Sequence, residues 1–301
     1  MRQKLPFNPL QSLLPRIFVR GKKHDARSRW EMRQMKDKHV AMAKADGFRS
    51  RAAYKLQELD SMFRLFKPGM TVVDLGFAPG AWSQVAAQRV RPGGRVIGVD
   101  ILPCIPPPGV SSIQGNFLSK ETQNELKRVL AVSAMGVPKD KDSGGAIGTA
   151  PPSYLDTERE LGSINSNSNE PQFGDDYPVD IVLSDMCETL PQEHGFFQRT
   201  INDPYYRMAN VSGIAVRDHA ASIDLCDAAL LFAIDTLKVG GSFACKVFTG
   251  EEDKFLQQRL KRMFHDVKRR KPEATRKESK ELYLVGLKRR KNVTVESVFG
   301  A

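Results

Sequence analysis

A glycine-rich turn between an apolar run and a helix is the first feature of this sequence that could do chemistry. It reads Val72-Val-Asp-Leu-Gly-Phe-Ala-Pro-Gly-Ala-Trp82. Gly76 and Gly80 allow the backbone to come close to a ligand, and the helix that follows offers unpaired N–H groups at its N-terminus. Asp100 ends the next apolar run, and a carboxylate there accepts hydrogen bonds from both hydroxyls of a ribose. These residues predict a nucleoside-type cofactor at the carboxyl ends of parallel strands.

The spacing of this turn favours a cationic cofactor over a dinucleotide. A dinucleotide-binding turn follows the pattern G-x-G-x-x-G, whereas here Pro79 precedes the second glycine and the third glycine is missing. Asp74 stands two residues before Gly76, where its carboxylate favours a positive charge. S-adenosylmethionine carries a sulfonium and an amino group and fits this requirement. A structural turn with an incidental aspartate is the alternative for the motif taken alone.

Lys246 is a charged residue inside an otherwise apolar run. The run reads Phe243-Ala-Cys-Lys-Val-Phe248, where an unpaired charge would be costly to bury. A catalytic lysine is one explanation, and burial without function is the other. Lys55 and Glu281, taken singly, read as solvated surface charges.

The elements that must position these residues alternate along the chain. Short β-like runs are predicted over 71–75, 95–99, 180–184, 242–248 and 282–287. Helices are predicted over 28–44, 49–66, 81–90, 121–130, 223–237 and 253–264. Strands that alternate with helices indicate an α/β fold, with a parallel sheet and helices on both faces.

In their order along the chain, the motifs resemble those of the FtsJ/RrmJ-type ribose 2′-O-methyltransferase family. They are Ser50-Arg-Ala-Ala-Tyr-Lys55-Leu, the glycine-rich turn, Asp180-Ile-Val-Leu-Ser-Asp185-Met, Gly240-Gly-Ser-Phe-Ala-Cys-Lys246-Val-Phe and Ser279-Lys-Glu281-Leu-Tyr-Leu-Val. The resemblance covers residues 45–130 and 178–288. It implies a Rossmann-like class I S-adenosylmethionine-dependent methyltransferase fold, with a seven-stranded, mostly parallel sheet. It also implies S-adenosyl-L-methionine as the cofactor.

The resemblance also assigns site residues. The family's Lys-Asp-Lys-Glu tetrad falls on Lys55, Asp185, Lys246 and Glu281. The cofactor contacts fall on Gly76, Pro79, Gly80, Ala81, Trp82, Asp100, Asn116 and Asp185. Asn116 is a departure, because the family usually has an aspartate there against the adenine amino group. An asparagine side-chain oxygen can still accept that hydrogen bond, with the loss of one charge.

The tetrad residue types suit the activation of a ribose hydroxyl. A 2′-OH must lose its proton as it attacks the sulfonium methyl in line, and Lys246 is the candidate general base. Lys55 would lower the pKa of Lys246 and would steady the developing alkoxide. Asp185 and Glu281 would orient the lysines, but their charges oppose the fall in that pKa. The sequence leaves this balance open.

The formal net charge of +11 is unevenly distributed along the chain. It is +13 over residues 1–120, −11 over 121–255 and +9 over 256–301. Two basic ends that meet in space would form a surface for a polyanion, and solvated tails are the alternative. We expect the basic segments 20–51 and 259–277 to hold RNA phosphates, which position an RNA without specifying a base.

Three segments lie outside the predicted catalytic fold. Residues 1–27 are basic and poor in acids, which is typical of a mitochondrial targeting segment; an RNA-binding or disordered tail is the alternative. Residues 134–178 are predicted as a disordered insertion within a single methyltransferase domain over 28–292, because they are rich in Gly, Pro, Ser, Asp and Asn. Residues 293–301 are predicted as a C-terminal tail. The connection 186–220 is a candidate substrate lid or channel wall.

Composition excludes several classes of protein. No run of about 18 apolar residues occurs, so a transmembrane helix is excluded. The cysteines at 104, 187, 226 and 245 form no C-x-x-C pair and no metal-ligand spacing. We therefore expect no disulfide scaffold and no metal site, and a reducing compartment. Nothing in the sequence implies an oligomer.

Together these features predict S-adenosylmethionine-dependent 2′-O-methylation of ribosomal RNA, with the RNA or a large-subunit precursor particle as partner. The stretch Gly47–Lys55 and the run that starts at Ala81 look most like those of mitochondrial large-subunit rRNA uridine methyltransferases. We therefore expect the mitochondrial matrix and a role in ribosome assembly. A tRNA ribose 2′-O-methyltransferase of the cytoplasm or nucleus is an alternative, as is an rRNA-binding assembly factor with secondary catalysis. A nicotinamide dehydrogenase fits the glycine spacing least.

Overall fold

The computed structural model describes residues 37–134, 177–188 and 211–300. From Lys38 onward these residues belong to one compact unit. The predicted targeting segment 1–27 lies outside the described residues, as do 135–176 of the predicted insertion and 189–210 of the predicted lid. No helix in the described part of the chain is long and apolar enough to cross a membrane.

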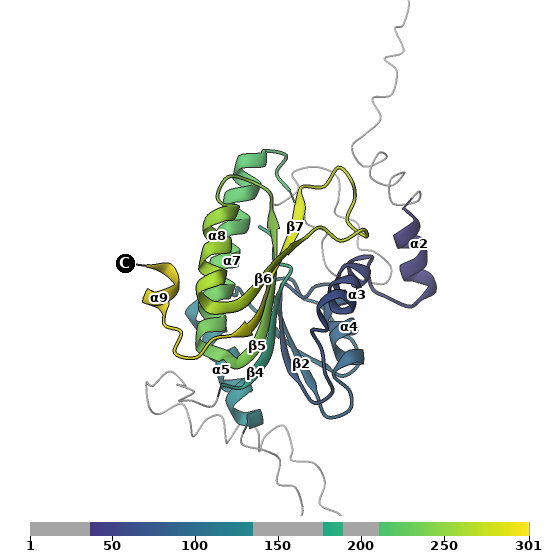
Figure 1. Ribbon diagram of the computed structural model, residues 1–301. Helices are drawn as coiled ribbons and strands as arrows, with labels where there is room; N and C mark the ends of the chain where they lie inside the picture. The colour runs from purple at the N-terminus through teal and green to yellow at the C-terminus, as the bar shows by residue number, and fades with distance from the viewer. Residues whose placement is uncertain (1–36, 135–176, 189–210, 301) are drawn as a thin grey trace, which may run out of the picture. The chain divides into compact units, whose positions relative to one another are not determined.

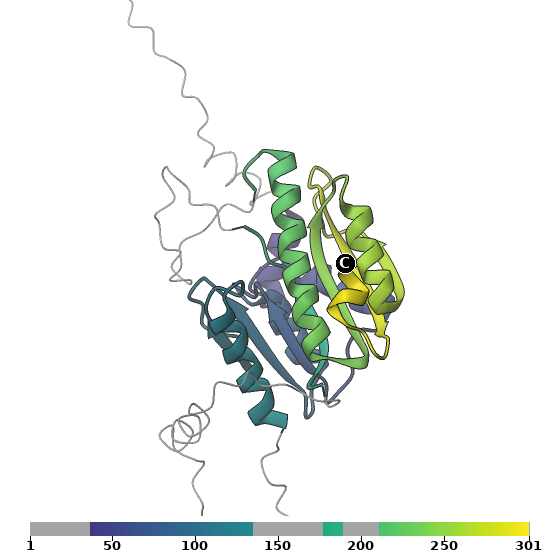
Figure 2. The ribbon, with the colours of Figure 1, turned by 90° about the vertical axis from the view of Figure 1, so that its left-hand side faces the viewer.

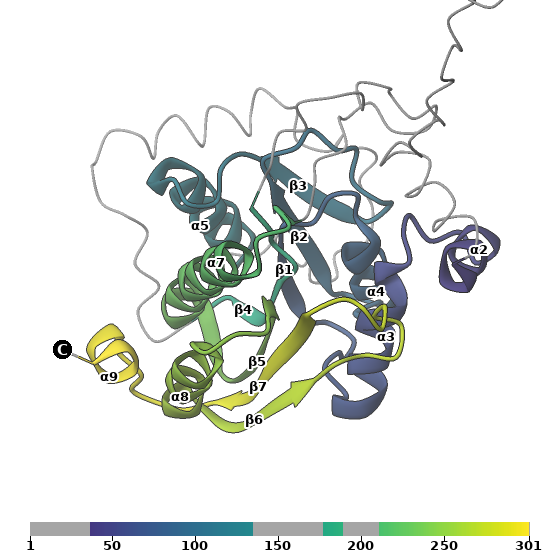
Figure 3. The same ribbon diagram turned by 90° about the horizontal axis from the view of Figure 1, so that it is seen from above.

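A seven-stranded sheet forms the centre of the unit (Figure 1). The strand order is β3-β2-β1-β4-β5-β7-β6, which Figure 3 labels in full. The strands are β1 (Thr71–Leu75), β2 (Arg95–Asp100), β3 (Val110–Gln114), β4 (Val179–Ser184), β5 (Leu237–Phe248), β6 (Phe264–Arg270) and β7 (Glu281–Arg289). Neighbours from β3 to β5 pair in parallel, and β7 runs antiparallel to both of its neighbours. The predicted seven-stranded, mostly parallel sheet is therefore confirmed.

Helices cover both faces of the sheet, which Figure 3 shows from above. On one face lie α3 (Ala52–Phe63) and α4 (Ala81–Arg89); on the other lie α5 (Lys120–Ala134), α7 (Ala215–Thr236) and α8 (Asp253–Met263). In Figure 2, α7 is the long green helix that runs along its face of the sheet. Two short helices, α2 (Lys38–Ala45) and α9 (Val295–Phe299), are the first and last elements of the described chain. This arrangement confirms the predicted fold class.

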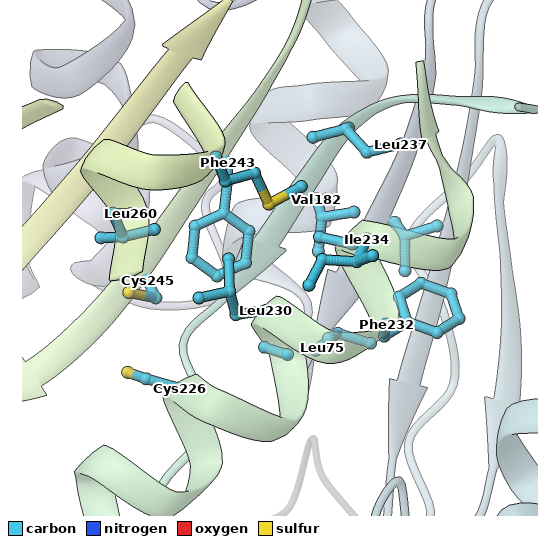
Figure 4. Close-up of a cluster of buried hydrophobic side chains, with 14 of the residues drawn as sticks. Leu75, Val182, Cys226, Leu230, Phe232, Ile234, Leu237, Phe243, Cys245 and Leu260 are labelled. Atoms are coloured by element: carbon cyan, nitrogen blue, oxygen red, sulfur yellow. The ribbon is translucent and has the colours of Figure 1, made fainter. Parts of the chain in front are cut away.

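The two faces carry separate hydrophobic cores, because successive side chains of a strand point to opposite faces. Val72 of β1 belongs to the core under α3 and α4, whereas its neighbour Val73 belongs to the core under α5, α7 and α8. Figure 4 shows the second core, where Leu230 of α7 and Phe243 of β5 are both fully buried. Central strands that are buried on both faces read as continuous apolar runs, which is why the sequence predicted them.

Two strands and the start of one helix were not predicted individually. β3 and β6 lie at the two edges of the sheet and expose polar residues, so their sequences lack a continuous apolar run. α7 begins at Ala215, ahead of the predicted start at Ile223. The last residues of the predicted lid segment, 215–220, are therefore helical.

The predicted C-terminal tail contains a helix that packs on the fold. Thr294 begins α9 with a capping box, in which Ser297 is the partner residue. Val298 is fully buried, and Arg262 of α8 donates a hydrogen bond to its carbonyl at 2.9 Å. Residues 293–300 are thus tied to α8.

Candidate active site

The four predicted tetrad residues meet at one end of the sheet, although they come from separate elements. Lys55 lies on α3, Asp185 directly follows β4, Lys246 lies in β5 and Glu281 begins β7. Ser184 of β4 is level with Cys245 of β5, and Phe248 of β5 is level with Glu281. The carboxyl ends of two parallel strands therefore meet the start of an antiparallel one.

Each lysine of the tetrad contacts a carboxylate. Lys55 Nζ lies 2.6 Å from Glu281 Oε2. Lys246 Nζ lies 3.2 Å from Asp185 Oδ1 and donates to the Asp185 backbone carbonyl at 2.7 Å. The Lys246 side chain is only 4% exposed, so the charge that is costly to bury has a partner. The structure brings all four residues together as two ion pairs.

Tyr283 connects the two ion pairs and was not predicted as a site residue. Its hydroxyl donates to Asp185 Oδ1 at 3.3 Å, and Lys55 Nζ lies 5.7 Å from the centroid of its ring. Trp82 packs against it with the ring centroids 5.5 Å apart. Burial raises the pKa of Tyr283 well above its ordinary value, and the charge of Asp185 acts in the same direction. The spacing held a signal, because Tyr283 stands two residues after Glu281 and so shares its face of β7.

The charges around Lys246 keep it protonated in the protein by itself. Burial lowers the pKa of Lys246. The charge of Asp185 raises it, with smaller contributions from Cys187 and Glu281, and together they leave this pKa above its ordinary value. Burial acts in the opposite direction on an acid and raises the pKa of Glu281, but the charges of Lys55 and Lys246 hold this pKa below its usual range. The sequence left open whether burial or the neighbouring acids dominate the pKa of Lys246. In the structure the acids dominate, and Lys246 is an ammonium.

The glycine-rich turn joins β1 to α4 as predicted and requires both of its glycines. Gly76 has φ +77°, and a Cβ there would lie 2.8 Å from the Cα of Met186. Gly80 precedes α4 with φ +101°, and a Cβ there would lie 2.9 Å from Cγ of Pro107. Both positions need glycine for their backbone conformation and for space. The turn is packed tightly between the chain after β4 and the loop after β2.

Asp100 and Asn116 hold the chain that follows β2 and β3. Asp100 accepts hydrogen bonds from the backbone N–H groups of Ala78 and Leu102, both at 2.9 Å. Asn116 Oδ1 accepts one from the N–H of Leu118 at 3.0 Å. The oxygen predicted to face an adenine amino group thus has one donor already, and a second lone pair remains for a ligand.

The remaining predicted cofactor contacts lie in and directly after the turn. Ala81 and Trp82 are both 2% exposed, and Trp82 Nε1 donates to the carbonyl of Ala52 at 3.0 Å. The carbonyl of Pro79 accepts a hydrogen bond from Arg49 at 2.9 Å. The Trp82 side chain therefore joins α4 to α3, and its N–H is already used within the protein.

Three carboxylates gather at the carboxyl ends of β1, β2 and β4, and they fit a cationic ligand. Asp74 is fully buried and accepts a hydrogen bond from Ser83 at 2.6 Å, while its Oδ1 has no hydrogen-bond partner among the described residues. Burial raises the pKa of Asp74 to about 7, and the charges of Asp185 and Asp100 contribute to the rise. A positive charge bound among them would relieve this repulsion.

Comparisons with known proteins agree with this geometry. The model of the FtsJ-like methyltransferase family matches residues 48–289. The chain is 43% identical to "rRNA methyltransferase 2, mitochondrial" of Saccharomyces cerevisiae over 96% of both chains. A protein of the same name from Schizosaccharomyces pombe is 37% identical over 87% of this chain and 95% of its own. "Ribosomal RNA large subunit methyltransferase E" of Thiobacillus denitrificans is 36% identical over 90% of this chain and 92% of its own. Because the match includes the turn and the whole tetrad, this chain belongs to the FtsJ-like methyltransferase family.

Proposed function

We propose that this protein transfers a methyl group from S-adenosylmethionine to a ribose 2′-hydroxyl of ribosomal RNA, with a uridine of mitochondrial large-subunit rRNA as the target. The observation that carries the proposal is the ion pair of buried Lys246 with half-buried Asp185, linked through Tyr283 to Lys55 and Glu281. The names of the relatives support ribosomal RNA as the substrate, and two of them support the mitochondrion as the location. The matrix as the compartment within it is part of the proposal.

S-adenosylmethionine fits the acidic end of the sheet. Asp74 and Asp185 would face its positive charges, and Asp100 would accept its ribose hydroxyls in addition to the two backbone donors it already holds. The unpartnered Oδ1 of buried Asp74 supports this assignment, because an oxygen left without a donor is costly unless a ligand satisfies it. When bound, the cofactor supplies a methyl group on a positively charged sulfur.

Lys246 would accept the proton of the ribose hydroxyl, which requires that its ammonium group first release one proton to solvent. The negative charge of Asp185 stabilises the ammonium form of Lys246. A positive charge bound beside Asp185 would offset that stabilisation and lower the pKa of Lys246. Lys55, compensated by Glu281, would steady the alkoxide. A positioned base contributes about 10²–10⁴-fold to the rate. Alignment of the hydroxyl by the surrounding side chains supplies a further part.

A basic cavity beside the tetrad supports a polyanionic substrate. The cavity has a volume of about 390 Å³, includes Glu281 in its wall, and is lined by the cations Arg269, Arg270, Lys271, Lys277 and Lys280. Arg269 pairs with Asp253, and Lys271 donates to the carbonyls of Lys277 and Ser279. The side chains of Arg269 and Lys271 therefore shape the cavity. Arg270, Lys277 and Lys280 are placed to contact RNA phosphates close to the reacting ribose.

Mass spectrometry of nucleosides tests the reaction and the substrate together. Mitochondrial large-subunit rRNA and tRNA would be compared from cells with and without the protein. We expect the loss of a 2′-O-methylated uridine from the large-subunit rRNA alone. Intact methylation of that rRNA would refute the proposal, and loss from tRNA instead would favour the tRNA enzyme.

Lys246→Ala separates catalysis from cofactor binding. We expect it to abolish methyl transfer while the Kd for S-adenosylmethionine, measured by calorimetry, changes little. Lys238→Ala is a matched control in the same strand, because Lys238 is 43% exposed and pairs with Asp180 away from the site. Full activity of Lys246→Ala would refute the mechanism. Rescue of ribosome assembly by the inactive variant would favour the assembly-factor function.

A further inference from the structure

Arg49 ties together two loops that border the proposed cofactor site. Its guanidinium donates to the carbonyl of Pro79 in the glycine-rich turn at 2.9 Å. It also donates to the carbonyls of Ile105 and Pro106, the latter at 3.2 Å, in the loop between β2 and β3. One side chain thus connects the turn after β1 with the loop after β2.

Further contacts fix Arg49 itself in place. Its backbone N–H donates to the side-chain oxygen of Gln84 on α4 at 3.2 Å. The side-chain nitrogen of Gln84 donates in return to the carbonyl of Gly47 at 2.8 Å. Gly80 leaves the room that this arrangement needs, because a Cβ there would lie 3.3 Å from Arg49 Nη1. Gln84 therefore holds the backbone at Gly47 and Arg49 against α4, which places the guanidinium beside the turn.

Asp100 accepts hydrogen bonds from the same two loops. It accepts from the N–H of Ala78 in the turn and from the N–H of Leu102 in the loop. Asp100 is the predicted partner of the cofactor ribose, so the position of its carboxylate depends on where both loops lie. A shift of either loop would move the ribose site.

We propose that Arg49 is a positioning residue of the cofactor site, and not one of the phosphate contacts expected from the basic segment 20–51. Its acceptors are three backbone carbonyls in two loops. The guanidinium reaches them from two nitrogens across its planar width, whereas an ammonium has all its donors on one nitrogen and spans a shorter distance. The proposal rests on the proposed function for the identity of the cofactor. The role of Arg49 in the site therefore depends on the shape of its guanidinium more than on its positive charge.

Two variants of the full chain separate shape from charge. In both Arg49→Lys and Arg49→Gln, we expect the Kd for S-adenosylmethionine to rise about tenfold, a change of about 1.4 kcal/mol. The kcat at saturating cofactor should change much less than the Kd. Lys44→Gln is the matched control, because it removes one exposed positive charge from the same segment and should leave this Kd unchanged.

Hydrogen exchange of the ligand-free protein gives a readout that needs no cofactor. We expect faster exchange at the amides of the non-proline residues in 76–80 and 101–109 in both Arg49 variants. A wild-type Kd in Arg49→Lys, or unchanged exchange in both variants, would overturn the proposal and favour a phosphate contact. Failure of the wild-type protein to bind S-adenosylmethionine would instead count against the proposed cofactor, and the exchange data would still decide the role of Arg49.

Discussion

Replacing Asp74 with asparagine should remove a pH dependence from the folding stability of this protein. Asp74 is fully buried, and burial raises its pKa from 3.8 to about 7. In the unfolded chain the carboxyl titrates at its ordinary pKa, so between these two values the folded state binds a proton that the unfolded state does not. The free energy of unfolding therefore falls as the pH rises through this window, and it levels off above the folded pKa.

The size of the effect follows from the width of the window. A shift from 3.8 to about 7 corresponds to about 4 kcal/mol in all, at about 1.4 kcal/mol for each unit of pKa. About 2.5 kcal/mol of this falls between about pH 5 and pH 8. Asparagine has the shape of the protonated carboxyl and can still bond with Ser83, so the variant should keep at pH 8 the stability that this site has at pH 5.

Urea unfolding at the two pH values measures the difference. The wild-type protein should lose more stability than Asp74→Asn between pH 5 and pH 8, by about 2.5 kcal/mol. Asp224→Asn is a suitable control, because it removes a carboxylate from an exposed position on α7 and should leave the wild-type slope intact. Equal slopes for the wild-type protein and Asp74→Asn would refute the reasoning.

Two further predictions concern the turn and the tetrad. Gly76→Ala places a Cβ 2.8 Å from the Met186 Cα at φ +77° and should cost about 2–4 kcal/mol in urea unfolding. Gly47→Ala, at φ +71° in open space, should cost only about 1–2 kcal/mol, and equal losses would show that space at Gly76 is not limiting. Glu281→Gln removes the partner of Lys55 and should lower kcat with little change in cofactor Kd. Because Glu281 also raises the pKa of the base, the pH at which activity rises should move to lower values, and an unmoved profile would contradict this.

The membership of the site could be predicted from the sequence because its residues stand at the ends of recognisable strands. Asp185 and Lys246 follow or lie in apolar runs that strands buried on both faces produce. The carboxyl ends of parallel strands lie along one edge of a sheet, so residues at those ends come together. Lys55 on α3 was different, because helix position alone says nothing about distance to a strand, and only the family resemblance assigned it.

The electrostatic state of the site and the role of Arg49 could not be predicted, because both depend on distances that only the fold sets. The protonation of Lys246 follows from an Asp185 carboxylate 3.2 Å away. Arg49 reads as one more cation of a basic segment. The fold brings it against the carbonyls of Pro79 and Ile105, which are 30 and 56 residues away along the chain. Edge strands β3 and β6 were missed for the opposite reason, since their sequences carry little apolar signal.

The cost of Asp74 is itself an argument about the ligand. Packing gives no reason for a carboxylate there, because one of its oxygens is buried without a hydrogen-bond partner among the described residues and its pKa is displaced toward neutrality. An asparagine would fill the same space without a buried charge. Asp74 lowers the stability of the folded protein, and this is explained if its charge raises the affinity for a positively charged ligand. The nearby Asp100 and Asp185 add to the same negative potential. Asp185 belongs to this acidic group and is also the main charge that keeps Lys246 protonated in the protein by itself. A cationic cofactor that neutralises Asp185 would therefore link cofactor binding to the readiness of the base.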